Sequence, residues 1–277
     1  MSERAPGIFK EHLVVAELQN LWNEQAVTGG PDDLTATIEL RLVDTHRPKG
    51  CVVVCPGGGY QNLAPHEAEP VAKLFNAAGV HACILRYRRA PHPYPVPLTD
   101  GIRAIRYVRA HAKQWRIDPE RIAMLGFSAG GHLVSTVSTQ FGRKFYRPAD
   151  AIDTESARPD AAILCYPVIS LLPPSAHEGS RMNLLGDADT PALRRRLSNE
   201  RQVTAATPPT FLWHTADDAA VPVQNSLAYA KALREHGVPF EMHIYPHGAH
   251  GLGLAEKDPH VGSWTASCLS WLHSLGY

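Results

Sequence analysis

The sequence lacks an excess of charge of either sign. Its 277 residues include 27 Lys and Arg and 27 Asp and Glu, so the formal net charge at pH 7 is zero. A neutral chain has no field that would draw it to nucleic acid or to an anionic membrane surface. We therefore expect neither of these partners, and we expect the substrate to be a neutral or modestly polar small molecule.

Long apolar runs are also missing. No stretch is long and apolar enough to span a bilayer, and the first residues, MSERAPGIFKEHL, lack the apolar core of a secretory signal. The sequence as it stands therefore predicts a cytoplasmic protein. A secreted protein whose signal had been removed would have the same appearance.

Cysteine is scarce and unpaired. The five cysteines are odd in number and widely scattered. Cys51 and Cys55 lie four residues apart, but on a strand-like run rather than on a zinc-ribbon turn, and no second pair accompanies them. We expect buried free thiols in a reducing compartment rather than a disulfide or a metal site.

Internal repeats, low-complexity tracts and linkers are absent, and strand-like runs alternate with helical patterns. This alternation predicts one α/β domain over residues 1–277 with a mostly parallel sheet and helices on both of its faces. Residues 34–43 alternate polar and apolar, which favours an antiparallel edge strand, and residues 29–33 form a loop. Residues 168–206 are rich in Pro, Ser, Asn and charge, and we interpret them as an insertion over the active face, with a short helix near 191–197. The other expected strands are 51–55, 80–87, 122–125, 161–167, 210–214 and 240–245, and the other expected helices are 67–78, 98–114, 226–236 and 262–275.

One glycine-bounded serine stands between an expected strand and an expected helix. Residues 126–130 read G-F-S-A-G, a G-x-S-x-G pattern, and their context is that of a nucleophile elbow. So sharp a turn strains its central residue, Ser128, and leaves room only for glycine two positions to either side. The hydroxyl is then held at a helix N-terminus, where backbone N–H groups can meet negative charge. The alternative is a glycine-rich β-to-α turn without function.

A second glycine-rich turn follows the expected central strand. Residues 56–60 read P-G-G-G-Y, and successive glycines let backbone N–H groups approach a ligand closely. This pattern favours an oxyanion hole that uses Gly58 or Gly59, with Tyr60 as a possible substrate-binding residue. A phosphate-binding loop is disfavoured, because no G-K-[ST] follows. A plain flexible loop is the remaining alternative.

A serine nucleophile needs a base, and the base needs an orienting carboxylate. In folds that carry a nucleophile elbow, the carboxylate and the base follow the serine in the sequence, on loops after late strands. The loop after 210–214 offers Asp217 and Asp218, and we prefer Asp218, three residues before Val221. The loop after 240–245 offers His247 and His250, and we prefer His250, which glycines flank. We expect the other histidines, including His132, to be structural.

These motifs occur together and in order, and the combination resembles the α/β-hydrolase esterases grouped with acetyl xylan esterases and feruloyl-esterase-like proteins, some of which are labelled xylanase B. The resemblance runs from about residue 49 to the C-terminus. In that group the acid is the second Asp before V-P, here Asp218, and the base is the His of G-x-H-G, here His250. Pro56 replaces the His of hormone-sensitive-lipase-like enzymes, which favours the acetylesterase branch. The motifs are P-G-G-G-Y (56–60), R-Y-R-x-A-P (86–91), G-F-S-A-G-G-H-L (126–133), H-T-A-D-D-x-x-V-P (214–222) and H-G-A-H-G-L-G-L (247–254).

The resemblance implies two-step acyl transfer without a metal or cofactor. In the terms of the resemblance, Ser128 attacks a short acyl ester, such as an acetyl group on a xylo-oligosaccharide, and the amides of Ala129 and of Gly58 or Gly59 bind the oxyanion. Three alternatives stay open: a short-chain carboxylesterase without sugar preference, a peptidase of the same fold, and a binding protein of that fold without catalysis.

Overall fold

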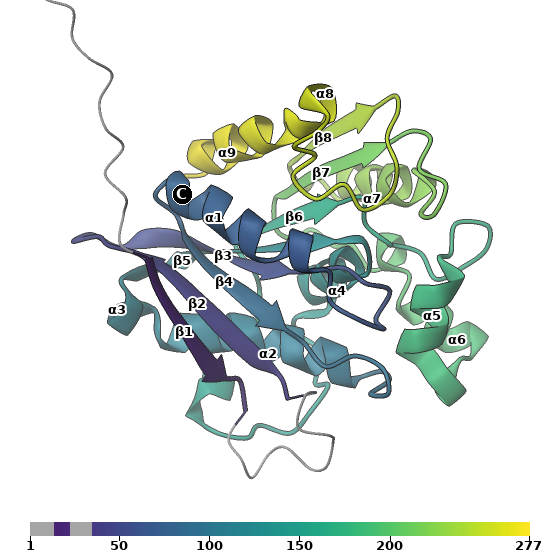
Figure 1. The fold of residues 1–277 in the computed structure, drawn as a ribbon. Helices are drawn as coiled ribbons and strands as arrows, with labels where there is room; N and C mark the ends of the chain where they lie inside the picture. Colours follow the sequence, from purple (N-terminus) through teal and green to yellow (C-terminus); the bar gives the residue numbers. More distant parts are fainter. Residues whose placement is uncertain (1–13, 23–34) are drawn as a thin grey trace, which may run out of the picture.

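A single sheet organises the part of the chain that the structure, a computed structural model, describes: residues 14–22 and 35–277. The sheet has eight strands, of which β3 to β8 run parallel to one another, while β2 is antiparallel to both of its neighbours (Figure 1). In spatial order the strands are β1 (Val14–Asn20), β2 (Thr37–Val43), β4 (His81–Arg86), β3 (Lys49–Cys55), β5 (Ile117–Phe127), β6 (Ala161–Cys165), β7 (Thr210–Thr215) and β8 (Phe240–Tyr245).

Helices cover both faces of this sheet, as the sequence predicts. Helices α1 and α9 pack on one face, and α2, α4 and α7 pack on the other (Figure 1). The alternation of side chains along β3 explains the two layers, because Val52 and Val54 belong to one apolar core and Val53 belongs to the other. The helices are α1 (Glu69–Ala77), α2 (Val96–Ala110), α3 (Ala112–Trp115), α4 (Ser128–Gln140), α5 (Glu178–Leu185), α6 (Pro191–Arg196), α7 (Gln224–Glu235), α8 (Pro259–Gly262) and α9 (Trp264–Ser274).

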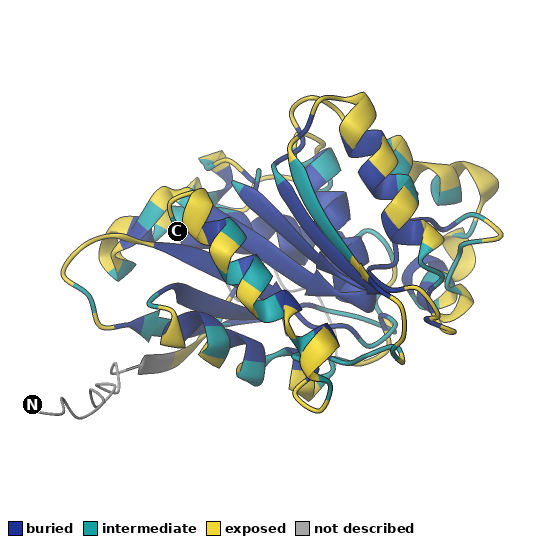
Figure 2. Cartoon of the chain, turned by 90° about the horizontal axis from the view of Figure 1, so that it is seen from above, coloured by how far each residue is buried: buried dark blue, intermediate teal, exposed yellow. Residues whose placement is uncertain are grey.

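Strands β6 and β7 are buried along their whole length, and β3 and β5 are buried over residues 50–55 and 122–127, whereas the helices expose their outer faces (Figure 2). All five cysteines are free and buried, which confirms the expectation of buried free thiols. None of the helices within residues 14–22 and 35–277 is long and apolar enough to cross a bilayer.

The N-terminal edge of the sheet differs from the prediction. Residues 34–43 were expected at the edge, but β1 pairs outside β2, so β2 is an inner strand. The sequence of β1 carries too weak an alternation to predict a strand. The predicted loop at 29–33 lies outside the described residues.

Two predicted helices divide. The 3-10 helix η3 (Pro65–Glu67) precedes α1, and Pro70 in the first turn of α1 suits a helix start. The expected helix at 98–114 becomes α2 and α3, separated at His111.

The segment 168–206 carries α5, which sequence periodicity did not predict, and α6, close to its expected place. Asn225, fully buried at the start of α7, fastens the beginning of this segment. Its Oδ1 accepts hydrogen bonds from the amides of Ile169 and Ser170, each at 2.9 Å, and its Nδ2 donates to the carbonyl of Ser175 at 2.9 Å. The segment is therefore anchored beside the loop that follows β7.

Candidate active site

Ser128 lies at the junction of β5 and α4, with a φ of 50°. A Cβ added at Gly126 would lie 2.2 Å from the carbonyl oxygen of Gly130, and one added at Gly130 would lie 2.2 Å from that of Cys55. The structure thus confirms that the turn is strained at its centre and needs glycine on both sides.

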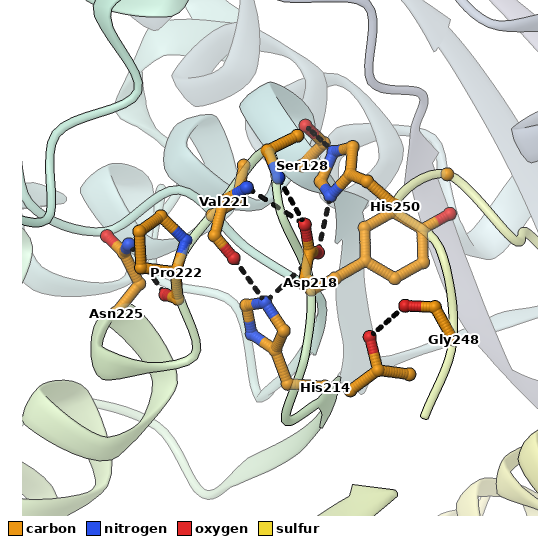
Figure 3. Close-up of polar contacts among 12 residues, drawn as sticks. Ser128, His214, Asp218, Val221, Pro222, Asn225, Gly248 and His250 are labelled. Carbon is orange, nitrogen blue, oxygen red and sulfur yellow. Dashed lines mark hydrogen bonds and ion pairs between the residues drawn. The ribbon is translucent and has the colours of Figure 1, made fainter. Parts of the chain in front are cut away.

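Ser128, His250 and Asp218 form a chain of hydrogen bonds (Figure 3). Nε2 of His250 is 2.8 Å from Oγ of Ser128, and Nδ1 of His250 is 2.6 Å from Oδ2 of Asp218. A carboxylate only accepts, so Nδ1 carries the hydrogen and Nε2 is free to accept the serine proton. The three residues follow β5, β8 and β7, so the carboxyl ends of these parallel strands bring them together. Such an arrangement can activate a serine hydroxyl.

The carboxylate of Asp218 is buried and fully hydrogen-bonded. Oδ1 accepts from the amides of Ala220 and Val221, each at 2.9 Å. Burial alone would raise the pKa of Asp218, but hydrogen bonds from His214, His250 and Val221 outweigh it and hold that pKa well below the usual range. Asp218 is therefore an anion at neutral pH, and it can stabilise a cationic His250.

A second histidine on this carboxylate was missed by the sequence reasoning, which treated it as structural. Nε2 of His214 lies 2.9 Å from the carbonyl oxygen of Val221 and 3.3 Å from Oδ2 of Asp218. A carbonyl only accepts, so Nε2 carries the hydrogen, and Nδ1 accepts from the hydroxyl of Ser226 at 2.8 Å. The sequence signal that could have identified His214 is a histidine near the end of a largely apolar strand, four residues before the acid.

The two acid and two base candidates pair separately. Asp217 lies at the surface, where Oδ2 is 2.9 Å from Nδ1 of His247 and Oδ1 accepts from the amide of Gly248 at 2.8 Å. Asp217 therefore holds the loop that carries His250 without touching its imidazole. A pocket of about 360 Å³ opens beside His250 and is lined by this loop and the loop after β7.

The glycine turn after β3 presents free amides. Gly58 has a φ of 125° and Gly59 a φ of 65°, both in the region that favours glycine. Within the described residues, the amides of Gly58 and Gly59 make no hydrogen bond. Ala129 is the second residue of α4, where amides have no acceptor in their own helix. Nδ2 of Asn183 on α5 donates to the carbonyl of Gly59 at 2.9 Å, so the 168–206 segment also fixes this turn.

Tyr60 does not lie where a substrate could reach it. Its φ of 59° turns the side chain inward, where it is fully buried, and its hydroxyl is 2.9 Å from Nδ1 of His132. Nε2 of His132 donates to the carbonyl of Leu197, so Nδ1 accepts from the phenol. The geometry argues against the predicted substrate contact and gives Tyr60 a structural place beside His132, which is itself buried and was expected to be structural.

No group of three or more His, Cys, Asp or Glu side chains within 14–22 and 35–277 is arranged to hold a metal ion.

Comparison with known proteins assigns the chain to a family. The BD-FAE family model matches residues 42–233, which include Ser128 and Asp218. A solved acetyl ester-xyloside bifunctional hydrolase from Caldicellulosiruptor lactoaceticus superposes with a TM-score of 0.89 at 47% identity, over 94% of this chain and 96% of that one.

Two curated relatives are similar over most of this chain. Endo-1,4-beta-xylanase B of Butyrivibrio fibrisolvens is 37% identical over 78% of the chain, and the acetylxylan esterase of Xylanibacter ruminicola is 33% identical over 82% of it. The matched regions span 34% and 46% of these longer relatives. The chain belongs to the BD-FAE family and has the α/β-hydrolase fold of carboxylic ester hydrolases.

Proposed function

We propose that the protein is a serine esterase that removes short acyl groups, acetyl above all, from carbohydrates such as acetylated xylo-oligosaccharides. The observation that carries the proposal is the hydrogen-bonded chain from Ser128 through His250 to Asp218. The same three residues follow the ends of β5, β8 and β7, where the α/β-hydrolase fold carries its catalytic groups.

The reaction runs in two steps. The Ser128 oxygen attacks the ester carbonyl carbon while its proton passes to Nε2 of His250, and Asp218 stabilises the imidazolium. The amides of Ala129 and of Gly58 or Gly59 donate to the oxyanion. His250 then protonates the departing alcohol, which leaves the acyl group on Ser128. In the second step water gives a proton to Nε2 of His250 and attacks the acyl carbon. His250 then returns this proton to the Ser128 oxygen, which releases the acid and restores the hydroxyl.

The names of the relatives support the sugar substrate. One is called an acetylxylan esterase, and the solved structure at 47% identity is that of an acetyl ester-xyloside bifunctional hydrolase. The 168–206 segment lies against the candidate site, because Asn183 donates to the glycine turn and the carbonyl of Ser175 accepts from Asn225 at the start of α7. We propose that this segment shapes the pocket for the alcohol part of the substrate.

Acetate release from acetylated xylo-oligosaccharides, measured beside p-nitrophenyl acetate and butyrate, tests the substrate. The wild type is compared with Ser128→Ala and with a control, Ser138→Ala. Ser138 lies on the same helix and is buried, and its hydroxyl has no hydrogen-bond partner among the described residues. We expect release from the sugar in the wild type and the control but not in Ser128→Ala. Activity on the aryl esters alone would contradict the sugar substrate and indicate a short-chain carboxylesterase without sugar preference.

A further inference from the structure

A buried carboxyl group lies under the glycine turn and has no part in the reaction above. Glu67 ends η3, and its side chain is 3% exposed. Oε2 accepts from the amide of Gly57 at 2.7 Å, and Oε1 accepts from the hydroxyl of Tyr166 at 2.6 Å. Burial raises the pKa of Glu67, although these two hydrogen bonds oppose the rise. A carboxyl group buried at this depth needs both donors.

The hydroxyl of Tyr166 continues the connection to the loop that carries His250. It accepts a hydrogen bond from the amide of Gly253 at 2.8 Å, three residues beyond His250. The ring of Tyr166 also meets the imidazole of His250 edge-on, with the ring centroids 5.0 Å apart. Tyr166 is buried and has a φ of 35°, a strained value for a bulky residue. Backbone strain at such a residue persists only where the surroundings hold it.

On its other side, Glu67 is separated from the nucleophile by the backbone of a single glycine, Gly57. A Cβ at Gly57 would lie 2.7 Å from Oε2 of Glu67 and 3.0 Å from Cβ of Ser128. Glu67 and Tyr166 thus connect the glycine turn, which carries the amides proposed to bind the oxyanion, with the loop that carries the proposed base. These segments lie far apart in sequence, and both must be placed accurately for acyl transfer.

We propose that Glu67 is a positioning residue that acts through Tyr166 to hold the glycine turn and the His250 loop at their working separation. The proposal rests on the proposed function of Ser128 and His250. Without this connection the two segments can shift independently, and a displacement of about 1 Å can cost about 10²-fold in rate.

The test uses Glu67→Gln, Tyr166→Phe and the double variant, with kcat and KM measured on p-nitrophenyl acetate. The amide oxygen of Gln can accept from only one of the two donors, and Phe removes one oxygen atom. We expect each single variant to lose about 10- to 100-fold in kcat while KM changes less than about threefold. The loss of kcat in the double variant should be no greater than that in the more impaired of the two single variants, because both changes break the same connection.

The matched control is Tyr229→Phe. Tyr229 is buried in α7, and its hydroxyl has no hydrogen-bond partner among the residues that the structure describes. We expect its kcat to equal that of the wild type, so that loss of a buried phenol oxygen by itself is excluded as the cause.

Three results would overturn the proposal: folded variants whose kcat lies within about twofold of the wild type, losses that multiply in the double variant, or a loss in KM alone. If Glu67→Gln does not fold, Tyr166→Phe carries the test, together with Glu67→Asp, which we expect to keep more kcat than Tyr166→Phe. Failure of the proposed function would look different, because a fluorophosphonate would then not label Ser128 in the wild type.

Discussion

Replacement of Asp218 by Asn probes the hydrogen-bond chain without changing its shape. The carboxylate accepts from the amides of Ala220 and Val221 on one oxygen and from His250 and His214 on the other. If the Asn oxygen keeps the two backbone amides, its NH₂ group faces two imidazole N–H groups. His250 can then avoid the clash only by moving its hydrogen from Nδ1 to Nε2. That tautomer cannot accept the proton of Ser128.

The expected loss follows from this tautomer change. In a serine protease the same substitution lowers kcat about 10⁴-fold, and we expect a loss of about 10³- to 10⁴-fold here. This range corresponds to about 4 to 5.5 kcal/mol of transition-state stabilisation. The proposed oxyanion donors are untouched, so activity above the uncatalysed rate should remain.

The matched control is Asp217→Asn, the same change one residue earlier. Asp217 holds His247 and the amide of Gly248 and does not reach His250, so we expect a loss of less than about tenfold. The assay is kcat/KM on p-nitrophenyl acetate for the wild type and both variants. A greater loss in Asp217→Asn than in Asp218→Asn would refute the reasoning and move the acid to Asp217.

Three further predictions concern the scaffold. Burial lowers the pKa of His132 from 6.5 to about 4, so the unfolded chain takes up a proton first as the pH falls, and stability is lost between pH 6.5 and 4. His132 alone should lower the free energy of unfolding by about 3 kcal/mol by pH 4. Between pH 7 and pH 5, urea titrations should show a smaller decrease in this free energy for His132→Gln than for the wild type; an equal decrease would contradict the prediction. A thiol reagent such as Ellman's should modify no cysteine in the native protein and all five in denaturant, because all five are buried; reaction of the native protein would contradict their burial. Gly126→Ala should lower the free energy of unfolding by about 3 kcal/mol, whereas Gly142→Ala, where an added Cβ meets nothing within 4 Å, should change it little; equal effects in urea titrations would show that the elbow is not crowded.

Much of the fold could be predicted from local pattern. The strand β8 has the predicted bounds, and the G-x-S-x-G pattern places the turn between β5 and α4. Side-chain period and turn chemistry are local properties, so a sequence displays them directly. The strand β1 could not be predicted, because its pairing with β2 supplies the order that its own alternation does not.

The candidate site, like the fold, could be predicted only in part from the sequence. The loops that carry Ser128, Asp218 and His250 could be named from motifs, and the structure brings these three residues together. Tyr60 could not be placed, because its inward turn depends on a left-handed backbone conformation and on His132. The contact between Glu67 and Tyr166 joins residues 99 positions apart, and no local pattern announces it.

Labelling with a fluorophosphonate, followed by mass spectrometry of the labelled peptide, tests the central claim most directly. We expect one label per chain on Ser128, no label in Ser128→Ala, and wild-type labelling in Ser138→Ala. A label on Ser128→Ala, or an unlabelled wild type that is folded, would contradict the account of Ser128 as an activated nucleophile.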